Sequence, residues 1–371
     1  MSNKTIYLGV IGVGGVGTHF LSQLSRLPNA PSLVLLARSS QTLTSPAPSY
    51  PAIPAANWQS AFISSSFEKS GSWSPEQIAS YLSGLPGRAV LVDNTSDPNV
   101  ANAYPLFLSK GISIVTPNKK AFSSSLKTWK EIFSNAASTN SLVYHESTVG
   151  AGLPVLSTLR DLVNTGDKVT RIEGVFSGTL SFLFNQFAPA SSGSGEKKQW
   201  SKVVAEAKGL GYTEPDPRDD LNGMDVARKL TILARIAGLD VEDPTSFPVE
   251  SLIPDELSIL DAGTKGAEEF MNRLGEFDGK MEDIKNSAEA EGKVVRYVGS
   301  VDVTGKKVSV GLQKFAKDSP IAGLKGSDNI ISFYTERYGE QPLIVQGAGA
   351  GGAVTAMGVT ADLIKILERL S

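Results

Sequence analysis

The residues best suited to chemistry lie in residues 211–229, a stretch that contains five carboxylates and two prolines. Asp225 and Lys229 stand four residues apart, so on a helix they occupy one strip of the surface. A half-buried lysine beside a carboxylate, facing a cleft, can give a proton to a developing alkoxide. An ordinary intrahelical ion pair, which stabilises a helix by about 0.3–0.5 kcal/mol, fits the same spacing equally well.

The loop before this pair favours the catalytic alternative. Glu214 and Asp220 have no basic neighbour in the loop apart from Arg218, so their carboxylates are available to an external cation. The ammonium group of an amino-acid substrate would supply one. The stretch therefore predicts the rim of an active site.

Cysteine and histidine offer few alternatives for catalysis. The chain has no cysteine and two histidines, which excludes disulfides, thiolate nucleophiles and Cys-ligated zinc. We interpret His19 as a helix-start residue and His145 as a supporting residue. General acid or base chemistry must then fall on Lys, Asp, Glu or Tyr, which again favours Lys229.

An amphipathic helix is expected over residues 224–239, where apolar residues recur at helical spacing. Arg228, Thr231 and Arg235 fall on its solvent side. Asp225 and Lys229 lie on a strip between the solvent side and the core, so we expect the pair to be half-buried. The expected buried face comprises Val226, Ala227, Leu230, Leu233, Ala234 and Ala237.

A glycine-rich turn near the N-terminus predicts a dinucleotide-binding fold. Residues 6–11 form a short apolar strand, and a helical stretch follows at residues 20–24. In this context Gly12 makes the turn, Gly14 lets a pyrophosphate approach the backbone, and Gly17 permits close packing of the helix. The helix N-terminus adds favourable positive charge. The residues expected to bind the cofactor here are Gly12, Val13, Gly14, Gly15, Val16 and Gly17.

The end of the next strand, at residues 33–36, bears on cofactor choice. Arg38 stands where NAD-specific folds usually have an acid and where NADP folds favour a guanidinium. The residue therefore favours NADP(H). The Ser and Thr residues after it suit either nucleotide, so NAD(H) stays open. Residues 39–75 are rich in Ser and Pro and predict an irregular excursion.

Two further buried strands, at residues 89–92 and 112–115, predict the rest of the cofactor site. Parallel sheets bind ligands beyond the carboxyl ends of their strands. Thr95 and Ser96 follow the first of these strands, and Lys119 and Lys120 follow the second. We expect all four at the cofactor cleft.

The segment that begins at Glu146 has two interpretations. Glu146 offers one hard oxygen ligand, and the small residues after it leave backbone carbonyls accessible, so a monovalent or divalent cation could bind. A tight turn between domains fits the segment equally well.

The second half of the chain predicts a different, mostly antiparallel sheet. Expected strands cover residues 169–177, 294–303, 307–312 and 330–334. The glycine-rich run at residues 347–352 leads into a last helix, but no strand follows, so it does not complete a second βαβ unit. We interpret it as a tail that returns to the first domain, with glycines such as Gly351 near the cofactor.

Length and charge set the outer limits. The chain has 371 residues, 41% hydrophobic and 20% charged, with a net charge of −3, which suits two domains and disfavours nucleic acid. No apolar stretch approaches the roughly 18–20 residues of a membrane span. We expect a soluble, cytoplasmic α/β protein with a Rossmann-type domain over residues 1–150, an α+β substrate domain over residues 151–340 and a C-terminal segment over residues 341–371.

These features together closely resemble the homoserine dehydrogenase family, in its short fungal form without a kinase or regulatory domain. The resemblance covers nearly the whole chain. Its most specific segments are residues 178–181, 211–229, 325–329 and 346–352. It implies NAD(P)-dependent interconversion of L-homoserine and L-aspartate 4-semialdehyde, the branch step toward threonine and methionine, in a homodimer formed through the second domain.

The resemblance also implies residue roles. Lys229 would donate the proton to the aldehyde oxygen, with Asp225 and Asp220 positioning it and the substrate hydroxyl. Glu214 would hold the substrate ammonium, and Lys120 would face both the substrate carboxylate and the nicotinamide. A sodium ion would bind the carboxylate of Glu146 and the carbonyls of Val149, Ala151 and Leu153.

Two other functions compete with this one. Aspartate-semialdehyde dehydrogenase shares the substrate and cofactor class, but its thioester chemistry needs a cysteine, which the chain lacks. A non-catalytic NADPH-sensing regulator would keep the glycine turn without needing Glu214, Asp220, Asp225 and Lys229. Cofactor preference, cation identity and feedback control stay open at this point.

Overall fold

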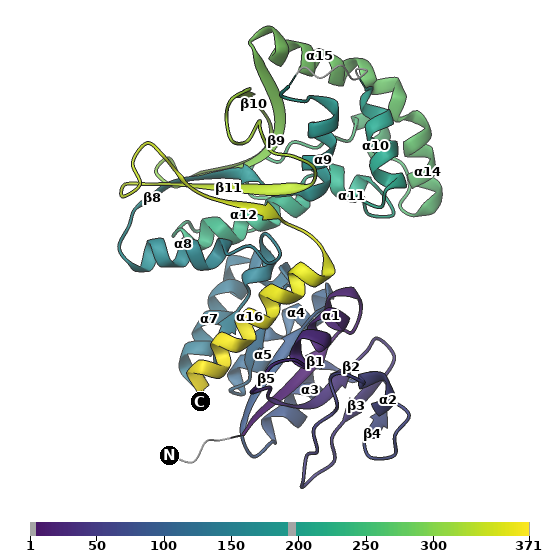
Figure 1. The fold of residues 1–371 in the computed structure, drawn as a ribbon, viewed down its shortest axis with the longest axis vertical. Coiled ribbons are helices and arrows are strands. Elements are labelled where there is room, and N and C mark those ends of the chain that lie inside the picture. Colours follow the sequence, from purple (N-terminus) through teal and green to yellow (C-terminus); the bar gives the residue numbers. More distant parts are fainter. Residues whose placement is uncertain (1–4, 192–197, 371) are drawn as a thin grey trace. The chain divides into compact units, whose positions relative to one another are not determined.

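The computed structural model describes residues 5–191 and 198–370 and divides the chain into two compact units (Figure 1). Unit 1 comprises the described residues up to Leu156 together with those from Ala350 onwards, and unit 2 is Ser157–Gly349. The chain thus leaves unit 1 once and returns to it near the C-terminus.

Unit 1 is built on a seven-stranded sheet in the order β4-β3-β2-β1-β5-β6-β7. The strands β2, β1, β5, β6 and β7 run parallel, which confirms the expected Rossmann-type fold. The glycine turn follows β1, where the strand order reverses between β2 and β5, the usual ligand site of such sheets. The parallel strands are β1 (Ile6–Ile11), β2 (Ser32–Ala37), β5 (Arg88–Asp93), β6 (Ser113–Val115) and β7 (Val143–Tyr144).

Helices cover this sheet, and the C-terminal helix is part of its core. Val359 and Leu363 of α16 pack in one cluster with Phe20 of α1 and with Leu8 and Val10 of β1. Packing of apolar side chains therefore fixes the returning tail to unit 1. The helices are α1 (Gly15–Leu24), α2 (Trp58–Ala61), α3 (Pro75–Ser83), α4 (Pro98–Asn102), α5 (Tyr104–Ser109), α6 (Lys120–Ser123), α7 (Leu126–Thr139) and α16 (Gly352–Leu370), with the short turn η1 (Glu146–Thr148).

The Ser- and Pro-rich excursion is more regular than its composition predicts. It contains two short strands, β3 (Thr42–Thr44) and β4 (Glu68–Ser70), which extend the sheet by antiparallel pairing with β2 and with each other. Leu43 is fully buried. The free edge of β2 supplies the pairing partner, so tertiary contact overrides local composition here.

Unit 2 contains a five-stranded sheet in the order β10-β9-β8-β11-β12, and every neighbouring pair is antiparallel. This confirms the expected antiparallel sheet. The strands are β8 (Val169–Val175), β9 (Lys293–Asp302), β10 (Lys307–Ala316), β11 (Asp328–Thr335) and β12 (Leu343–Ala348). β12 lies at the sheet edge, and the chain joins unit 1 only from Ala350.

The helices of unit 2 are mostly short. α8 (Val155–Asn164) begins at the end of unit 1 and lies mainly in unit 2. The others are α9 (Gly178–Phe187), α10 (Trp200–Gly209), α11 (Arg218–Leu221), α12 (Met224–Ile236), α13 (Asp255–Ser258), α14 (Thr264–Arg273) and α15 (Asp278–Ala290), with the turn η2 (Leu274–Phe277).

The helix α12 buries more of its surface than its pattern predicts. Thr231 and Arg235 were expected on the solvent side, but they are 0% and 6% exposed. Thr231 Oγ1 donates to Ala227 O, and the Arg235 guanidinium donates to Val241 O and Glu242 O. These bonds satisfy the polar groups, so their burial carries no large penalty. The helix ends at Ile236, shortly before Gly238 takes a positive φ of 93°.

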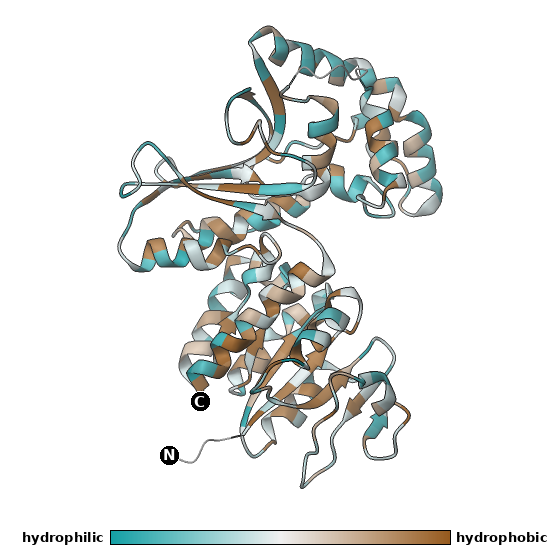
Figure 2. Ribbon diagram, in the orientation of Figure 1, coloured by the Kyte–Doolittle hydropathy of each residue, from teal (hydrophilic) through white to brown (hydrophobic). Residues whose placement is uncertain are grey.

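Hydrophobic residues are concentrated in the strands of the unit 1 sheet, whereas hydrophilic residues cover much of α15 (Figure 2). No helix in residues 5–191 or 198–370 is both long and apolar enough to cross a membrane.

Candidate active site

Lys229 and Asp225 form an ion pair across one turn of α12. The Nζ atom of Lys229 lies 2.8 Å from Asp225 Oδ2, and the two side chains are 10% and 41% exposed. The pair is therefore half-buried as the sequence predicts. Nζ also donates to the carbonyl oxygen of Phe176 at 2.6 Å. The ammonium is held between a carboxylate and a carbonyl, with limited access to water.

The start of α12 places this pair close to the sheet. Gly223 precedes the helix with a φ of 74°, and a Cβ there would lie 2.1 Å from the hydroxyl of Tyr297 on β9. Only glycine accommodates both the left-handed backbone and this close approach. Phe176 directly follows β8, so Lys229 reaches from the helix to the end of a central strand.

Asp220 organises the loop before α12. Its Oδ2 atom accepts from the backbone N–H of Glu214 at 2.8 Å, and its Oδ1 atom accepts from Thr179 Oγ1 at 3.0 Å. Partial burial raises the pKa of the Asp220 carboxyl, and the nearby charges of Glu214 and Asp225 raise it further. Three carboxylates thus face one region of unit 2, which suits a cationic ligand.

Arg218 does not neutralise this region, because its guanidinium is bound to Asp216. Nε and Nη2 of Arg218 donate to the Asp216 carboxylate at 2.6–3.1 Å, and the remaining donors reach the carbonyls of Leu260 and Asp261. The carboxylate of Glu214 is exposed, and no hydrogen-bond partner for it occurs among residues 5–191 and 198–370. Glu214 remains available to an external cation.

In unit 1, the glycine turn needs glycine at two positions for steric reasons. Gly12 has a φ of 86°, and a Cβ there would lie 2.7 Å from the methyl carbon of Thr95. A Cβ on Gly17 would lie 2.0 Å from the carbonyl oxygen of Gly12. A Cβ on Gly14 or Gly15 would meet no atom within 4 Å, so space is open above the turn.

A buried carboxylate holds the neighbouring loops in place. Asp93, at the end of β5, accepts from the Tyr104 hydroxyl at 2.6 Å, from the Thr95 N–H at 2.8 Å and from Asn118 Nδ2 at 3.1 Å. Burial raises the pKa of Asp93, although these hydrogen bonds oppose the shift. Asn118 Oδ1 in turn accepts from the N–H of Lys120 at 3.2 Å. The network fixes the strand ends that carry Thr95, Ser96, Lys119 and Lys120.

Asn94 is a candidate cofactor ligand that the sequence analysis did not single out. Its side chain lies beside Gly17, and neither Nδ2 nor Oδ1, both buried, has a hydrogen-bond partner among the described residues. A buried amide without partners at the glycine turn suits a ligand with hydrogen-bonding groups. The signal was its position directly after a buried strand.

Arg38 is exposed beyond the end of β2. Its guanidinium carbon lies 5.4 Å from the ring centre of Phe62 and 6.0 Å from that of Trp58. The aromatic residues come from the excursion around α2, which therefore lies against this arginine. Gly351, the glycine expected near the cofactor, has a φ of 119°. A Cβ on the next residue, Gly352, would lie 2.9 Å from His19 of α1.

Glu146 is buried beside the C-terminal helix. Its Oε1 atom accepts from the N–H of Leu156 at 2.6 Å, and its backbone N–H donates to Asp362 Oδ2 at 2.8 Å. Lys365 Nζ lies 4.0 Å from Glu146 Oε2. Ala151 takes an unusual φ of 54° in the segment that follows. No group of three or more His, Asp or Glu side chains able to hold a metal ion occurs in the part of the chain that is described.

Three partners in unit 2 also escaped the sequence analysis: the Phe176 carbonyl, Thr179 and Asn329. A backbone carbonyl has no sequence signal. Thr179 and Asn329 reach their partners across 41 and 153 residues of sequence, respectively. Only the segments that carry the resemblance, residues 178–181 and 325–329, pointed to their neighbourhood.

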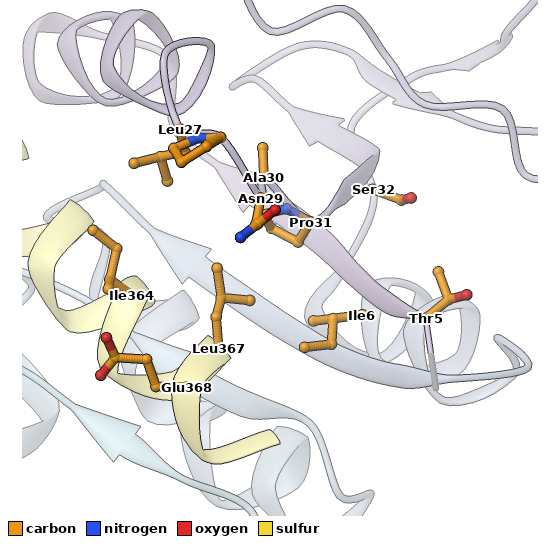
Figure 3. A pocket seen from close by; sticks show the side chains of 11 residues that line it. Thr5, Ile6, Leu27, Asn29, Ala30, Pro31, Ser32, Ile364, Leu367 and Glu368 are labelled. Carbon is orange, nitrogen blue, oxygen red and sulfur yellow. The ribbon is translucent and has the colours of Figure 1, made fainter. Parts of the chain in front are cut away.

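A pocket in unit 1 is unrelated to these groups (Figure 3). Its volume is about 450 Å³, and its lining includes Thr5, Ile6 and Ser32 beside Ile364 and Leu367 of α16. Thr5, Ile6 and Ser32 mark the beginnings of β1 and β2, whereas the glycine turn follows the end of β1. The pocket therefore lies at the opposite end of the strands.

Known proteins resemble the chain in both units. A family model described as homoserine dehydrogenase matches residues 154–364, and one described as homoserine dehydrogenase, NAD binding domain matches residues 12–146. A homoserine dehydrogenase of Paracoccidioides brasiliensis is 78% identical, with 100% of each chain covered.

Solved structures agree. A Candida auris protein of unknown function is 50% identical, with a TM-score of 0.91 and 99% of each chain covered. A hyperthermophilic archaeal homoserine dehydrogenase in complex with NADPH shares the fold, with 23% identity, a TM-score of 0.73 and 98% of each chain covered.

Proposed function

Since the chain belongs to the homoserine dehydrogenase family, we propose that Lys229 is the proton donor and acceptor of its reaction. The enzyme is an NAD(P)-dependent oxidoreductase that interconverts L-homoserine and L-aspartate 4-semialdehyde, the branch step toward threonine and methionine. The single observation that carries the assignment of Lys229 is its buried ammonium, held by Asp225 at 2.8 Å and by Phe176 O at 2.6 Å.

The chemistry of the proton follows from this placement. The nicotinamide, when bound, supplies or accepts the hydride. During aldehyde reduction negative charge grows on the carbonyl oxygen, and an adjacent ammonium both stabilises that charge and delivers a proton. Asp225, 2.8 Å away, holds the nitrogen of Lys229 in place from the same helix. In the oxidative direction the neutral amine of Lys229 takes the hydroxyl proton.

Acidic residues of the loop bind the substrate in this proposal. Glu214 pairs with the substrate ammonium, which its exposed carboxylate suits. Asp220 fixes Glu214 through the backbone N–H of that residue and, with Asp225, positions Lys229 and the substrate hydroxyl. Lys120, carried by the network around Asp93, binds the substrate carboxylate beside the nicotinamide.

The residues of unit 1 fit a nicotinamide dinucleotide. Open space above Gly14 and Gly15, and the unpartnered amide of Asn94, are what a bound pyrophosphate and its neighbouring groups would use. The set of cofactor-binding residues that we propose is Gly12, Val13, Gly14, Gly15, Val16, Gly17, Arg38, Thr95, Ser96, Lys119, Lys120 and Gly351. The exposed guanidinium of Arg38 favours NADP(H), because it can pair with a 2′-phosphate.

A monovalent cation, sodium in this proposal, binds Glu146 and the carbonyls of Val149, Ala151 and Leu153. The strained backbone at Ala151 supports a specialised turn. A tight turn is the alternative for this segment, since Glu146 accepts a backbone hydrogen bond and faces Lys365.

Unit 2 would serve for substrate binding and dimerisation, and the enzyme would act in the cytoplasm as a homodimer. The homodimer comes from the family resemblance, whereas the cytoplasmic location comes from the composition of the sequence and from its lack of a long apolar stretch. Light scattering tests the dimer, and fluorescence microscopy of the tagged protein tests the location.

The deciding experiment for Lys229 is an absorbance assay of NADPH formation from L-homoserine by wild type and Lys229→Ala. We expect the variant to fold and to lose turnover. A folded variant with near-normal turnover would remove the lysine from the mechanism.

A further inference from the structure

The carbonyl oxygen of Phe176 binds two side chains at once. It accepts from Lys229 Nζ at 2.6 Å and from Asn329 Nδ2 at 3.1 Å. Asn329 is fully buried and lies on β11, whose next residue, Ile330, pairs with Val175 at the end of β8. The proposed proton donor and a buried amide therefore share one acceptor.

The orientation of the Asn329 amide follows from this contact. If the amide were reversed, its oxygen would face the carbonyl oxygen of Phe176, and the two would repel each other. In the orientation found, Oδ1 is buried without a hydrogen-bond partner among the described residues. An apolar side chain of similar volume would avoid leaving that acceptor unpaired. An amide at this position therefore lowers the stability of the fold, which indicates that its N–H group has a function.

A glycine locks this side chain in place. A Cβ on Gly349 would lie 2.0 Å from Nδ2 and 2.2 Å from Cγ of Asn329. The backbone directly after β12 therefore packs against the amide, and only glycine at residue 349 permits so close an approach. This contact explains one glycine of the run at residues 347–352 without reference to a nucleotide.

We propose that Asn329 is a positioning residue for Lys229. Its N–H group holds the Phe176 carbonyl at a fixed point, so the nitrogen of Lys229 returns to the same place after each proton transfer. Gly349 secures Asn329 in turn. The inference rests on the proposed function of Lys229, because a fixed acceptor matters only if the lysine reacts.

The test compares Asn329→Leu, Asn329→Ser and wild type in steady-state kinetics with L-homoserine and NADP. Leucine has a similar volume but no donor, so we expect kcat to fall roughly 10- to 100-fold, as misplacement of a reacting group does, with little change in KM. Serine keeps a hydroxyl donor and should recover part of kcat. A thermal melt checks that each variant is folded.

A second variant covers the case in which Asn329→Leu fails to fold. Gly349→Ala leaves the amide in the chain but displaces it, so the same selective fall in kcat is expected. The matched control is Gly279→Ala on α15, where a Cβ meets no atom within 4 Å. This control should keep normal kinetics.

Two outcomes separate the inference from its premise. If Lys229→Ala is inactive while Asn329→Leu and Gly349→Ala keep full kcat, Asn329 has no positioning role, although Lys229 stays catalytic. If Lys229→Ala keeps its turnover, the premise itself is wrong. Combining Asn329→Leu with Lys229→Ala should add little to the loss measured for Lys229→Ala alone. Multiplying effects would show that the two residues act independently and would overturn the proposal.

Discussion

Lys229 is 10% exposed and its partner Asp225 is 41% exposed, yet their charged atoms lie 2.8 Å apart. The lysine reaches its carboxylate from the inner side of α12, and the carboxylate meets solvent. This asymmetry places the proposed proton donor in a poorly hydrated site, where its charge would act strongly on a developing oxyanion. Asp225 meanwhile remains open to exchange with water.

Lys229→Met should lower kcat by about 10²–10⁴-fold, the usual contribution of a general acid or base, with a small effect on KM. A charge that acts mainly in the transition state changes kcat and kcat/KM together. Turnover in both directions, measured by NADPH absorbance, checks this.

The matched control is Lys285→Met on α15. Lys285 is also a buried lysine, 2% exposed and paired with Glu282 at 2.6 Å, but it has no proposed role in the reaction. Its kcat should be normal. An equal loss of kcat in both variants would mean that removing a buried lysine lowers turnover through folding, and that Lys229 has no special catalytic role.

Glu214→Gln should raise KM for L-homoserine about 10- to 100-fold, which corresponds to the loss of one charged hydrogen bond of about 1.5–3 kcal/mol. kcat should change much less, because the ammonium of the substrate does not react. Asp219→Asn, an exposed carboxylate of the same loop, is the control. If KM is the same in the Glu214 variant and wild type, the ammonium binds elsewhere.

Asp220 should control the acid side of the pH profile. Burial raises the pKa of this carboxyl, so as pH falls it becomes neutral earlier than an ordinary aspartate. We expect kcat/KM for aldehyde reduction to fall in that range, because the neutral carboxyl no longer positions Lys229 and the substrate hydroxyl. Asp220→Asn should have low activity throughout and should lack this acid limb. An unchanged limb would assign it to another group.

The same shift has a consequence for stability. Because the folded state binds the Asp220 proton more tightly than the unfolded state does, its contribution is fullest below the ordinary pKa. That contribution falls as pH rises through the raised value.

Arg38→Ala should weaken the binding of NADPH more than the binding of NADH. The guanidinium stands beyond β2, 5.4 Å from the ring centre of Phe62. It can form a full ion pair only with a cofactor that carries a 2′-phosphate. KM for both cofactors in the reductive direction measures the ratio. Arg26→Ala, another exposed arginine of unit 1, serves as the control. Equal losses for the two cofactors contradict a phosphate contact.

Local patterns were enough to predict the main elements and the half-buried ion pair between Asp225 and Lys229. The strand and glycine turn around Gly12, the antiparallel sheet of unit 2 and the pairing of Asp225 with Lys229 depend on spacing within a few residues. The helical spacing of α12 wrongly predicted Thr231 and Arg235 on the solvent side. Each of them buries its polar group against a backbone carbonyl, which the spacing cannot show. Spacing reports which face is apolar, and it does not report what satisfies a polar side chain.

Distant contacts could not be predicted in the same way. Asp220 meets Thr179 across 41 residues, and Asn329 meets Phe176 O across 153. Such contacts depend on how β8, β11 and the helices pack, which is a property of the whole unit. The short strands of the excursion, β3 and β4, likewise form only because β2 has a free edge. Local composition cannot show which distant strand or side chain will supply the hydrogen-bonding partner.

Arg218→Met should destabilise the enzyme by about 1.5–3 kcal/mol at neutral pH, because it removes charged hydrogen bonds to a largely buried carboxylate. Hydrogen bonds from Arg218 lower the pKa of Asp216. A depressed carboxyl pKa adds stability above the ordinary value of about 3.9, and this stability is lost as pH falls through the lowered value. The difference between wild type and variant should therefore shrink in acid. Urea unfolding at neutral and acidic pH measures it.

The control for this variant is Arg273→Met. Arg273 pairs with Glu269 and Glu276, but its side chain is 39% exposed, so its loss should cost much less stability than the loss of Arg218. Arg218 should also affect kinetics, because Asp216 and Arg218 anchor the loop that carries Glu214 and Asp220. KM for L-homoserine should rise in the Arg218 variant and not in the Arg273 variant. Destabilisation that is equal at both pH values would show that Arg218 acts through its bonds to Leu260 and Asp261 carbonyls instead of through Asp216.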